Sequence, residues 1–364
     1  MKVERNIHLR KGVTGFLKDI WRDAHYRYFW SNPWRHMVYR WGWHLRPVLM
    51  TAGKYPLAVD VEFANGCNFR CIMCQQSTNW LPKADETFMS WDTLAKVMDQ
   101  AMRLGVHSMK VNWRGEATLD PDCGRKCLYM KMMGVHELQM NTNASKLTEE
   151  LSVELIESLD RIIFSCDGIS PETYNKIRRG GNFDIFLEKL KMFRQLRDLK
   201  SSKLPFWHPR KGLPVIRLNM AIMEQNHHEV PQVRKFFKDL VDEVFFNSVY
   251  QPQGSKGVNK GQKRQEKRQG CPQIWQRLIV DVRGNVMPCC VDYQEKIKMG
   301  NVHQQSLRVI WHGRARDLRN AHKNHRGRSI PGCASCDNFS LSKKNDKGEV
   351  EWTDTGSTAG GTGC

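Results

Sequence analysis

The segment from Ala58 to Cys74 constrains the chain most, because a short alternating apolar stretch runs directly into three closely spaced cysteines. Its sequence is AVDVEFANGCNFRCIMC, and the cysteines are Cys67, Cys71 and Cys74. A tight loop can turn three sulfurs with CxxxCxxC spacing toward one centre, and thiolates favour soft metals and iron–sulfur clusters. A 4Fe–4S cluster held by three cysteines keeps one iron open, whereas a structural zinc usually has four protein ligands. Zinc is therefore the less favoured alternative, and a disulfide is less favoured still.

Length and charge narrow the class of protein. A chain of 364 residues with 40% apolar content can build one large domain, or one domain with a small second one. Its formal charge of +19 favours an anionic partner, which can be a phosphorylated substrate, nucleic acid or an acidic membrane surface. The start, MKVERNIHLRKG, lacks the apolar core of a signal peptide, and no apolar run approaches a membrane span. We expect a cytoplasmic protein.

The middle of the chain alternates strand-like and helix-like segments, which is the pattern of repeated βα units around a parallel sheet. Ser90 and Gly105 predict the start and stop of one helix, Thr148 caps another, and 184–199 is a third. The predicted strands are 57–63, 107–113, 135–140, 161–166, 215–222 and 242–248. Six such units predict an α/β fold, a partial (β/α)6 TIM-like barrel whose chemistry sits at the C-terminal ends of the strands.

The composition divides the chain into five predicted segments. A basic, Trp-rich extension precedes the barrel; it can line a binding surface or lie on a membrane, but a helical extension packed on the barrel is favoured. Within it Pro33 and Pro47 are expected to break any single long helix. The segments are 1–55 (extension), 56–250 (barrel), 251–270 (basic linker), 271–340 (a second cysteine domain) and 341–364 (flexible tail).

Polar residues follow the predicted strands at the positions where barrel chemistry is expected. They are Trp113-Arg114-Gly115-Glu116 after the second strand, Asn141-Thr142-Asn143 after the third and Ser165-Cys166-Asp167-Gly168 after the fourth. Together with the CxxxCxxC loop, this order resembles the radical S-adenosylmethionine (SAM) superfamily. The resemblance implies that Cys67, Cys71 and Cys74 bind a 4Fe–4S cluster, and that its open iron chelates SAM. SAM is then cleaved to a 5'-deoxyadenosyl radical, which removes a hydrogen atom from the substrate.

The resemblance also implies which residues contact SAM. Gly115 and Glu116 match the family's GGE motif, which holds the amino group of SAM, with Arg114 in place of the first glycine. Asn141, Ser165 and Asp167 are placed to bond its ribose and carboxylate, and Asn219 on the fifth strand is a weaker candidate. The alternatives are an ordinary strand-to-helix turn at the motif and a core hydrogen bond for a polar residue within a strand.

The second cysteine set lies beyond the linker and consists of Cys271, Cys289, Cys333 and Cys336. Cys271, Gly284 and Cys289 resemble the opening Cx(9–15)Gx4C of the SPASM extension, and the four cysteines match the shorter Twitch form, which holds one auxiliary 4Fe–4S cluster. A structural zinc is the alternative. The segment around Arg283-Gly284-Asn285 predicts a β-hairpin, and a helix is expected near Leu307 to His322.

The other five cysteines carry weaker predictions. Cys290 adjoins a predicted ligand and is a candidate hydrogen-atom donor to a substrate radical. No chemistry is assigned to Cys123, Cys127, Cys166 and Cys364, because a free cysteine is commonly a small buried apolar residue.

We therefore expect an enzyme, a radical SAM oxidoreductase or epimerase with two 4Fe–4S clusters, SAM and an electron donor such as flavodoxin or ferredoxin. The substrate expected first is a polar small molecule, neutral or anionic, that resembles a sugar or aminocyclitol, and a ribosomal peptide is second. A non-catalytic iron–sulfur carrier and an RNA-binding protein are the alternatives from other classes. Nucleic acid and a membrane surface are not favoured as partners, and the sequence does not predict the oligomeric state.

Overall fold

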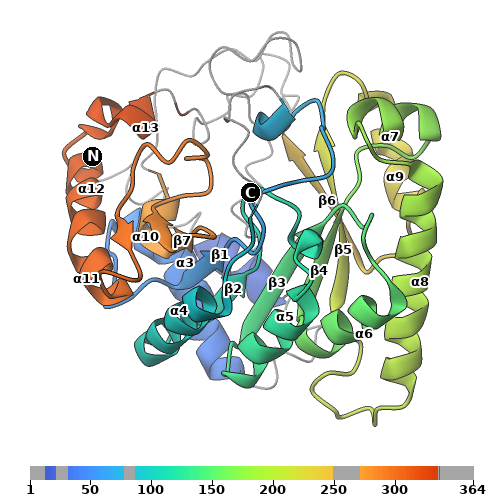
Figure 1. Cartoon of the computed structure of the whole chain (residues 1–364), viewed down its shortest axis with the longest axis horizontal. Coiled ribbons are helices and arrows are strands. Elements are labelled where there is room, and N and C mark those ends of the chain that lie inside the picture. The colour runs from blue at the N-terminus through green and yellow to red at the C-terminus, as the bar shows by residue number, and fades with distance from the viewer. Residues whose placement is uncertain (1–12, 22–31, 78–86, 249–270, 335, 337–364) are drawn as a thin grey trace.

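The computed structural model describes residues 13–21, 32–77, 87–248, 271–334 and 336. Their strands form a nine-stranded sheet in the order β6-β5-β4-β3-β2-β1-β7-β8-β9, with helices packed on its outer side (Figure 1). The strands are β1 (Ala58–Val61), β2 (Ser108–Lys110), β3 (Glu137–Thr142), β4 (Arg161–Ser165), β5 (Val215–Ile222), β6 (Glu243–Ser248), β7 (Arg277–Val280), β8 (Asn285–Met287) and β9 (Gly300–Asn301). The first six are parallel and lie in chain order, which confirms the partial TIM-like barrel.

Two of the predicted helices begin or end at the capping residues identified in the sequence. Ser90 caps α4 by accepting a hydrogen bond from Thr93 N, Gly105 ends it in the left-handed region, and Thr148 caps α6, all as predicted. The predicted helix 184–199 is the longer α8. The helices are α3 (Pro33–Leu49), α4 (Trp91–Leu104), α5 (Cys123–Met132), α6 (Glu149–Ser158), α7 (Pro171–Ile177), α8 (Phe183–Ser202), α9 (Val230–Phe236), α10 (Gln273–Gln276), α11 (Leu307–His312), α12 (Arg314–Lys323) and α13 (Pro331–Ala334).

The prediction that Pro47 breaks the N-terminal helix is wrong. Pro33 begins α3 and Pro47 lies in its last turn. A proline leaves the carbonyl four residues earlier without its helical partner. Here that carbonyl belongs to Trp43, and it accepts a hydrogen bond of 2.7 Å from Gln276 Nε2 of α10. The C-terminal segment thus supplies the bond that the proline removes.

The C-terminal segment extends the barrel sheet. Its β7 pairs with β1 in parallel, and β8 returns antiparallel to β7, so the predicted hairpin is confirmed. Gly284 makes the turn with φ of 81°. The predicted single helix near 307–322 is two helices, because the backbone at Gly313 leaves the helical region between α11 and α12. The predicted linker 251–270 and tail 341–364 lie outside the described residues.

The two faces of the sheet differ in chemistry. On the outer face apolar side chains such as Val59, Met109 and Leu138 pack against the helices in one large core. On the inner face, here called the lumen, charged and polar side chains alternate with them. These are Asp60, Lys110, Gln139, Arg161, Arg217, Glu243 and Arg277, and all except the half-buried Glu243 are at most 2% exposed.

Helix α3 packs at the N-terminal end of the lumen. Arg40 donates to Glu137 at the start of β3, and the guanidinium of Arg277 lies 5.0 Å from the ring centre of Trp43. On the outer side of α3, Trp34 and Trp41 are exposed. None of the described helices is long and apolar enough to cross a membrane.

Candidate active site

The three-cysteine loop follows β1 and is fixed by backbone bonds to the segment around the end of α7. Arg70 N donates to Arg179 O at 2.8 Å, and Ile72 N donates to Ile177 O at 3.0 Å. Cys74 N donates to Cys71 O, which closes a tight turn between two of the sulfurs. These backbone bonds fix the positions from which the three sulfurs project.

The chemistry of the three thiols fits a cationic cluster. Burial raises the pKa of Cys67 to about 12 and that of Cys71 to about 11, and it also raises the pKa of Cys74. The negative charges of Glu116 and of the other two cysteines raise the pKa of Cys67 further. Three thiolates are thus unfavourable here unless positive charge is supplied, and the irons of a cluster supply it.

The predicted SAM motif lies directly against this loop. Glu116 N donates to Gly66 O at 2.9 Å, and a side chain at Gly115 would collide with the carbonyl oxygens of Ala64 and Gly66. A glycine is therefore required at position 115 for the motif to approach the backbone that leads into Cys67.

The carboxylate of Glu116 ties the ends of two strands together. Its Oε1 accepts from Thr142 Oγ1 at 2.8 Å and from Thr118 Oγ1 at 2.7 Å, and its Oε2 accepts from Asn143 N at 2.7 Å. Glu116 is 4% exposed, and burial raises its pKa. Oε1 is already occupied by neighbours in the chain, so a bond to the ammonium of SAM would be made through the remaining capacity of Oε2.

Arg114, in the position of the family's first glycine, binds two acids. It forms a bidentate pair with the buried Glu62, with Nε–Oε1 and Nη2–Oε2 both at 2.8 Å, and its Nη1 lies 2.8 Å from Glu295 Oε1. Glu62 directly follows β1, whereas Glu295 follows the cysteines of the C-terminal segment. Arg114 thus fastens the SAM motif to both elements, a role that the sequence alone did not suggest.

The polar residues after β3, β4 and β5 fall into two groups. Ser165 and Asn219 are paired in register and share the lumen face with Asn141, so the fold brings these three predicted residues to one surface. Asp167 is turned into the protein instead. Its carboxylate pairs with Arg178 at 2.8 Å and accepts from Ala221 N at 2.7 Å, and the residue is fully buried.

Charge in the lumen is largely neutralised by pairs. Arg277 lies 2.6 Å from Asp60, and Arg217 lies 2.6 Å from Glu243. Burial lowers the pKa of Lys110 to about 8, although the charge of Asp60 opposes the shift. Arg161 lies 3.5 Å from Glu137, so four cations face three acids, and the lumen is strongly polar with a small excess of positive charge.

The four cysteines of the second set converge. Cys289 lies within electrostatic range of the other three, and Cys271 within range of Cys333 and Cys336. Burial raises the pKa of Cys271 to about 12 and also raises that of Cys289. Neighbouring cysteines raise the pKa values of Cys271 and Cys289 further, so this set, like the first, fits a metal cluster that supplies positive charge.

Cys290 directly follows the predicted ligand Cys289 and is buried. It is 1% exposed, its carbonyl accepts from Trp113 Nε1 at 2.9 Å, and its sulfur lies 3.2 Å from Gln273 Oε1. A thiol sulfur can give a hydrogen atom to a substrate radical, whereas an oxidised sulfur has none to give. The donor role therefore applies only to its reduced thiol.

Tyr293 joins the two cysteine sets. Its ring stacks on Trp113 with centroids 6.3 Å apart, its carbonyl accepts from Arg114, and charges on both Cys74 and Cys289 act on its hydroxyl. Burial raises the pKa of this hydroxyl. Sequence reasoning missed Tyr293, because only the fold shows that the segment after Cys289 docks on the motif after β2.

The remaining cysteines behave as small core residues. Cys123 and Cys127 are fully buried within the outer core, and Cys166 donates from its thiol to Gly168 O. Cys364 lies outside the described residues.

Comparisons with known proteins agree with this geometry. The family model "Radical SAM superfamily" matches residues 61–202, and the SPASM model "Iron-sulfur cluster-binding domain" matches residues 271–337. A probable GTP 3',8-cyclase of Saccharolobus islandicus is 28% identical over 171 residues, which are 47% of this chain and 49% of that protein. The chain thus spans about half the length of the curated relatives it matches.

Two solved structures show the same fold. BtrN in complex with AdoMet and 2-DOIA is 17% identical, with 79% of this chain and 95% of that chain covered and a TM-score of 0.50. Streptococcus suis SuiB bound to the precursor peptide SuiA is 13% identical, with 85% and 77% covered and a TM-score of 0.60. The two family models, in this order on this fold, identify the chain as a radical SAM enzyme with a C-terminal SPASM-like domain, whose cofactors are SAM and two 4Fe–4S clusters.

Proposed function

We propose that the protein oxidises a C–H bond of a polar, uncharged or weakly charged small molecule, of the size and polarity of a sugar or aminocyclitol. When bound, the first cluster and SAM supply the radical that removes one hydrogen atom from the substrate. Dehydrogenation of an alcohol then removes a proton and a second electron, so it needs a one-electron acceptor near the substrate. The residues Cys271, Cys289, Cys333 and Cys336 would hold that acceptor as the auxiliary cluster.

The observation that carries this proposal is the polar end of the lumen. Asn219 Oδ1 is buried and has no hydrogen-bond partner within the described structure, and Ser165 lies beside it in register. A buried acceptor of this kind is costly unless a ligand donates to it. The hydroxyl or amino groups of a sugar-like substrate are suitable donors, and the paired charges deeper in the lumen do not demand an anion.

The contact between the two cysteine sets favours oxidation. Trp113, Arg114 and Tyr293 bring the segment after Cys289 onto the SAM motif through bonds of 2.8–3.3 Å. An auxiliary cluster held there would lie on the same side of the barrel as the first cluster, because Tyr293 lies within range of both Cys74 and Cys289. Proximity of that kind is what a second electron transfer from a substrate radical requires.

The individual residues would then have these roles. Cys67, Cys71 and Cys74 would hold the first cluster. Gly115 and Glu116 would receive the amino group of SAM, while Ser165, Asn141 and Asn219 would bind its ribose or the substrate. Asp167 would act through Arg178 by fixing α7 behind the cysteine loop, because its own carboxylate is occupied.

The second candidate is modification of a peptide. It is favoured by the likeness to SuiB, whose solved structure holds the precursor peptide SuiA, with 85% of this chain covered. The third is epimerisation, in which reduced Cys290 would return a hydrogen atom to the opposite face of the substrate carbon. The three differ in product and in the origin of the hydrogen.

Deuterium transfer tests the proposal. Anaerobically reconstituted protein is given SAM, a reductant such as flavodoxin, and carbon-deuterated polyols, aminocyclitols or peptides, one class at a time. We expect deuterium in 5'-deoxyadenosine with a polyol or aminocyclitol, together with a ketone product. Transfer from peptides alone would refute the proposed substrate class, and an inverted alcohol in place of a ketone would refute oxidation.

A point variant connects this assay to the lumen. Asn219→Ala should raise KM for the substrate without loss of either cluster, because it removes the unpaired acceptor. Asn320→Ala is the matched control, since Asn320 is exposed on α12. An unchanged KM in Asn219→Ala would contradict the placement of the substrate.

A further inference from the structure

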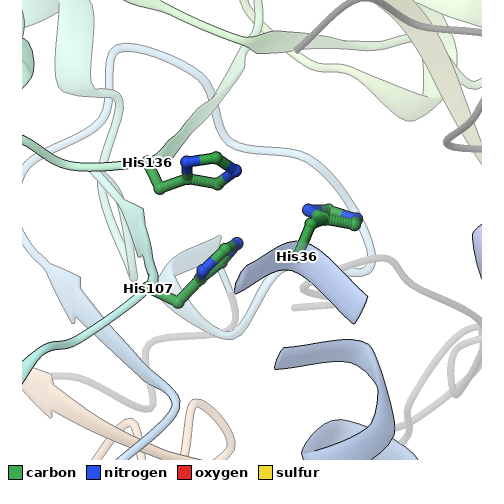
Figure 2. Close-up of side chains that lie close together, drawn as sticks. All are labelled: His36, His107 and His136. Atoms are coloured by element: carbon green, nitrogen blue, oxygen red, sulfur yellow. The ribbon is translucent and has the colours of Figure 1, made fainter. Parts of the chain in front are cut away.

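Three histidines meet at the end of the sheet opposite the cysteines. His36 lies on α3, His107 directly precedes β2 and His136 directly precedes β3. One nitrogen of each ring lies within 4.8 Å of a nitrogen of each other ring. Figure 2 shows the three rings turned toward one another. The residues are far apart in sequence, so the fold alone assembles them.

His107 and His136 have buried ring nitrogens without a hydrogen-bond partner within the described structure. His107 is 4% exposed, and neither of its ring nitrogens has a hydrogen-bond partner within the described structure. Nε2 of His136 is likewise buried without a partner there. Burial lowers the pKa of His107 and lowers that of His136 to about 4, so both rings are neutral near pH 7. Neutral imidazoles with unshared lone pairs are ligands for transition metals.

We propose that His36, His107 and His136 bind a divalent transition metal ion, with Zn²⁺ as the first choice. Zn²⁺ accepts imidazole nitrogens at about 2.0–2.1 Å and is usually four-coordinate, so three histidines leave one position for water. The distances between the ring nitrogens allow such an ion after small side-chain rotations. The ion would fasten α3 to the starts of β2 and β3, away from both cysteine sets, and so would have a structural role.

The environment of His36 determines how it would bind the metal. Arg40 Nε donates to His36 Nε2 at 3.2 Å, which places the ring proton on Nδ1. Binding through Nδ1 moves this proton to Nε2 and requires Arg40 to release the ring. Glu137 at 3.2 Å and Asp19 at 4.0 Å hold the other guanidinium nitrogens, so Arg40 stays paired when it turns. The same two acids place negative charge beside the ion.

Zinc analysis of the reconstituted protein tests this site. The protein carrying both iron–sulfur clusters receives one equivalent of Zn²⁺ and is desalted. Metal content and X-ray absorption at the zinc edge are then measured. We expect about one zinc per chain with a shell of nitrogen and oxygen at about 2.0–2.1 Å. A sulfur shell at about 2.3 Å would place the zinc at the cysteines and overturn the proposal, as would failure to retain zinc.

Variants assign the ligands. His107→Gln and His136→Gln should each lose the zinc while keeping the iron content of the unmutated protein, which shows that they fold. His228→Gln is the control, because His228 is exposed and outside the cluster. Addition of Zn²⁺ should raise the melting temperature of the unmutated protein and of His228→Gln, but not of the other two. Retention of zinc by both His107→Gln and His136→Gln would refute the site. A melting temperature of the unmutated protein that does not change on addition of Zn²⁺ would also refute it.

Discussion

Replacement of Arg114 by methionine should strongly destabilise the protein. Its guanidinium makes three charge-assisted bonds of 2.8 Å, two of them to Glu62, whose side chain is fully buried. Loss of one partner of a buried pair costs about 3–5 kcal/mol, because the other charge stays buried without compensation. Since Glu295 is more exposed, most of this cost comes from Glu62.

The pH dependence of the variant gives a second measurement. Burial already raises the pKa of Glu62 with Arg114 in place, and loss of the guanidinium should raise it further. A carboxyl with a raised pKa in the folded state binds more protons folded than unfolded, so stability falls as the pH rises between the two pKa values. The stability deficit of Arg114→Met should therefore shrink as the pH is lowered from neutral toward the unfolded pKa.

Urea unfolding under anaerobic conditions, followed by tryptophan fluorescence, measures both effects. Arg103→Met is the matched control, because its pair with Asp99 lies on the surface of α4 and is worth about 0.2–1 kcal/mol at most. The double variant Arg114→Met/Glu62→Gln should recover part of the loss, since the stranded carboxylate is gone. If Arg114→Met is no less stable than Arg103→Met, Arg114 does not join the motif to the two acids as argued.

Three further predictions address the cofactor site. Replacing Cys67, Cys71 and Cys74 together by alanine should leave about four irons per chain and abolish SAM cleavage, whereas about four irons in the unmutated protein would exclude two clusters. Glu116→Gln should weaken SAM binding, by about 1.5–3 kcal/mol if the ammonium bond is made, with iron content unchanged; equal affinity by calorimetry would contradict the assignment. Cys290→Ala should leave dehydrogenation nearly normal. If the variant instead loses inversion of the substrate carbon, and the unmutated enzyme places solvent deuterium at that carbon, the reaction is epimerisation.

The sequence predicted the features that local patterns determine. The helix boundaries at Ser90, Gly105 and Thr148 were correct because caps act within a few residues. The strand order was correct because βα units wind in chain order. The placement of β7 beside β1 was not predicted, because this pairing joins segments far apart in the chain and leaves no local pattern.

The site was predicted in part for the same reason. Cysteine spacing marked both cysteine sets, but the contacts of Arg114, Tyr293 and His107 depend on segments that meet only in the fold. The polar lumen could have been predicted from one weak sequence pattern, a charged residue within an apolar strand. Asp60 interrupts the apolar strand β1, and parallel strands covered on both faces usually read as continuous apolar runs.

The SAM motif of this chain departs from the family's GGE motif at Arg114, and the acids around Arg114 explain how. An arginine at the first position of GGE is unfavourable beside a buried cluster loop unless its charge is matched. Glu62 matches it from the end of β1, and Glu295 matches it from the segment that follows Cys289. Glu62 can match this charge from within the barrel, and Glu295 adds a second acid that ties the SAM motif to the C-terminal segment. Arg114→Gly alone should therefore behave like Arg114→Met, because it also leaves the buried Glu62 without its cation.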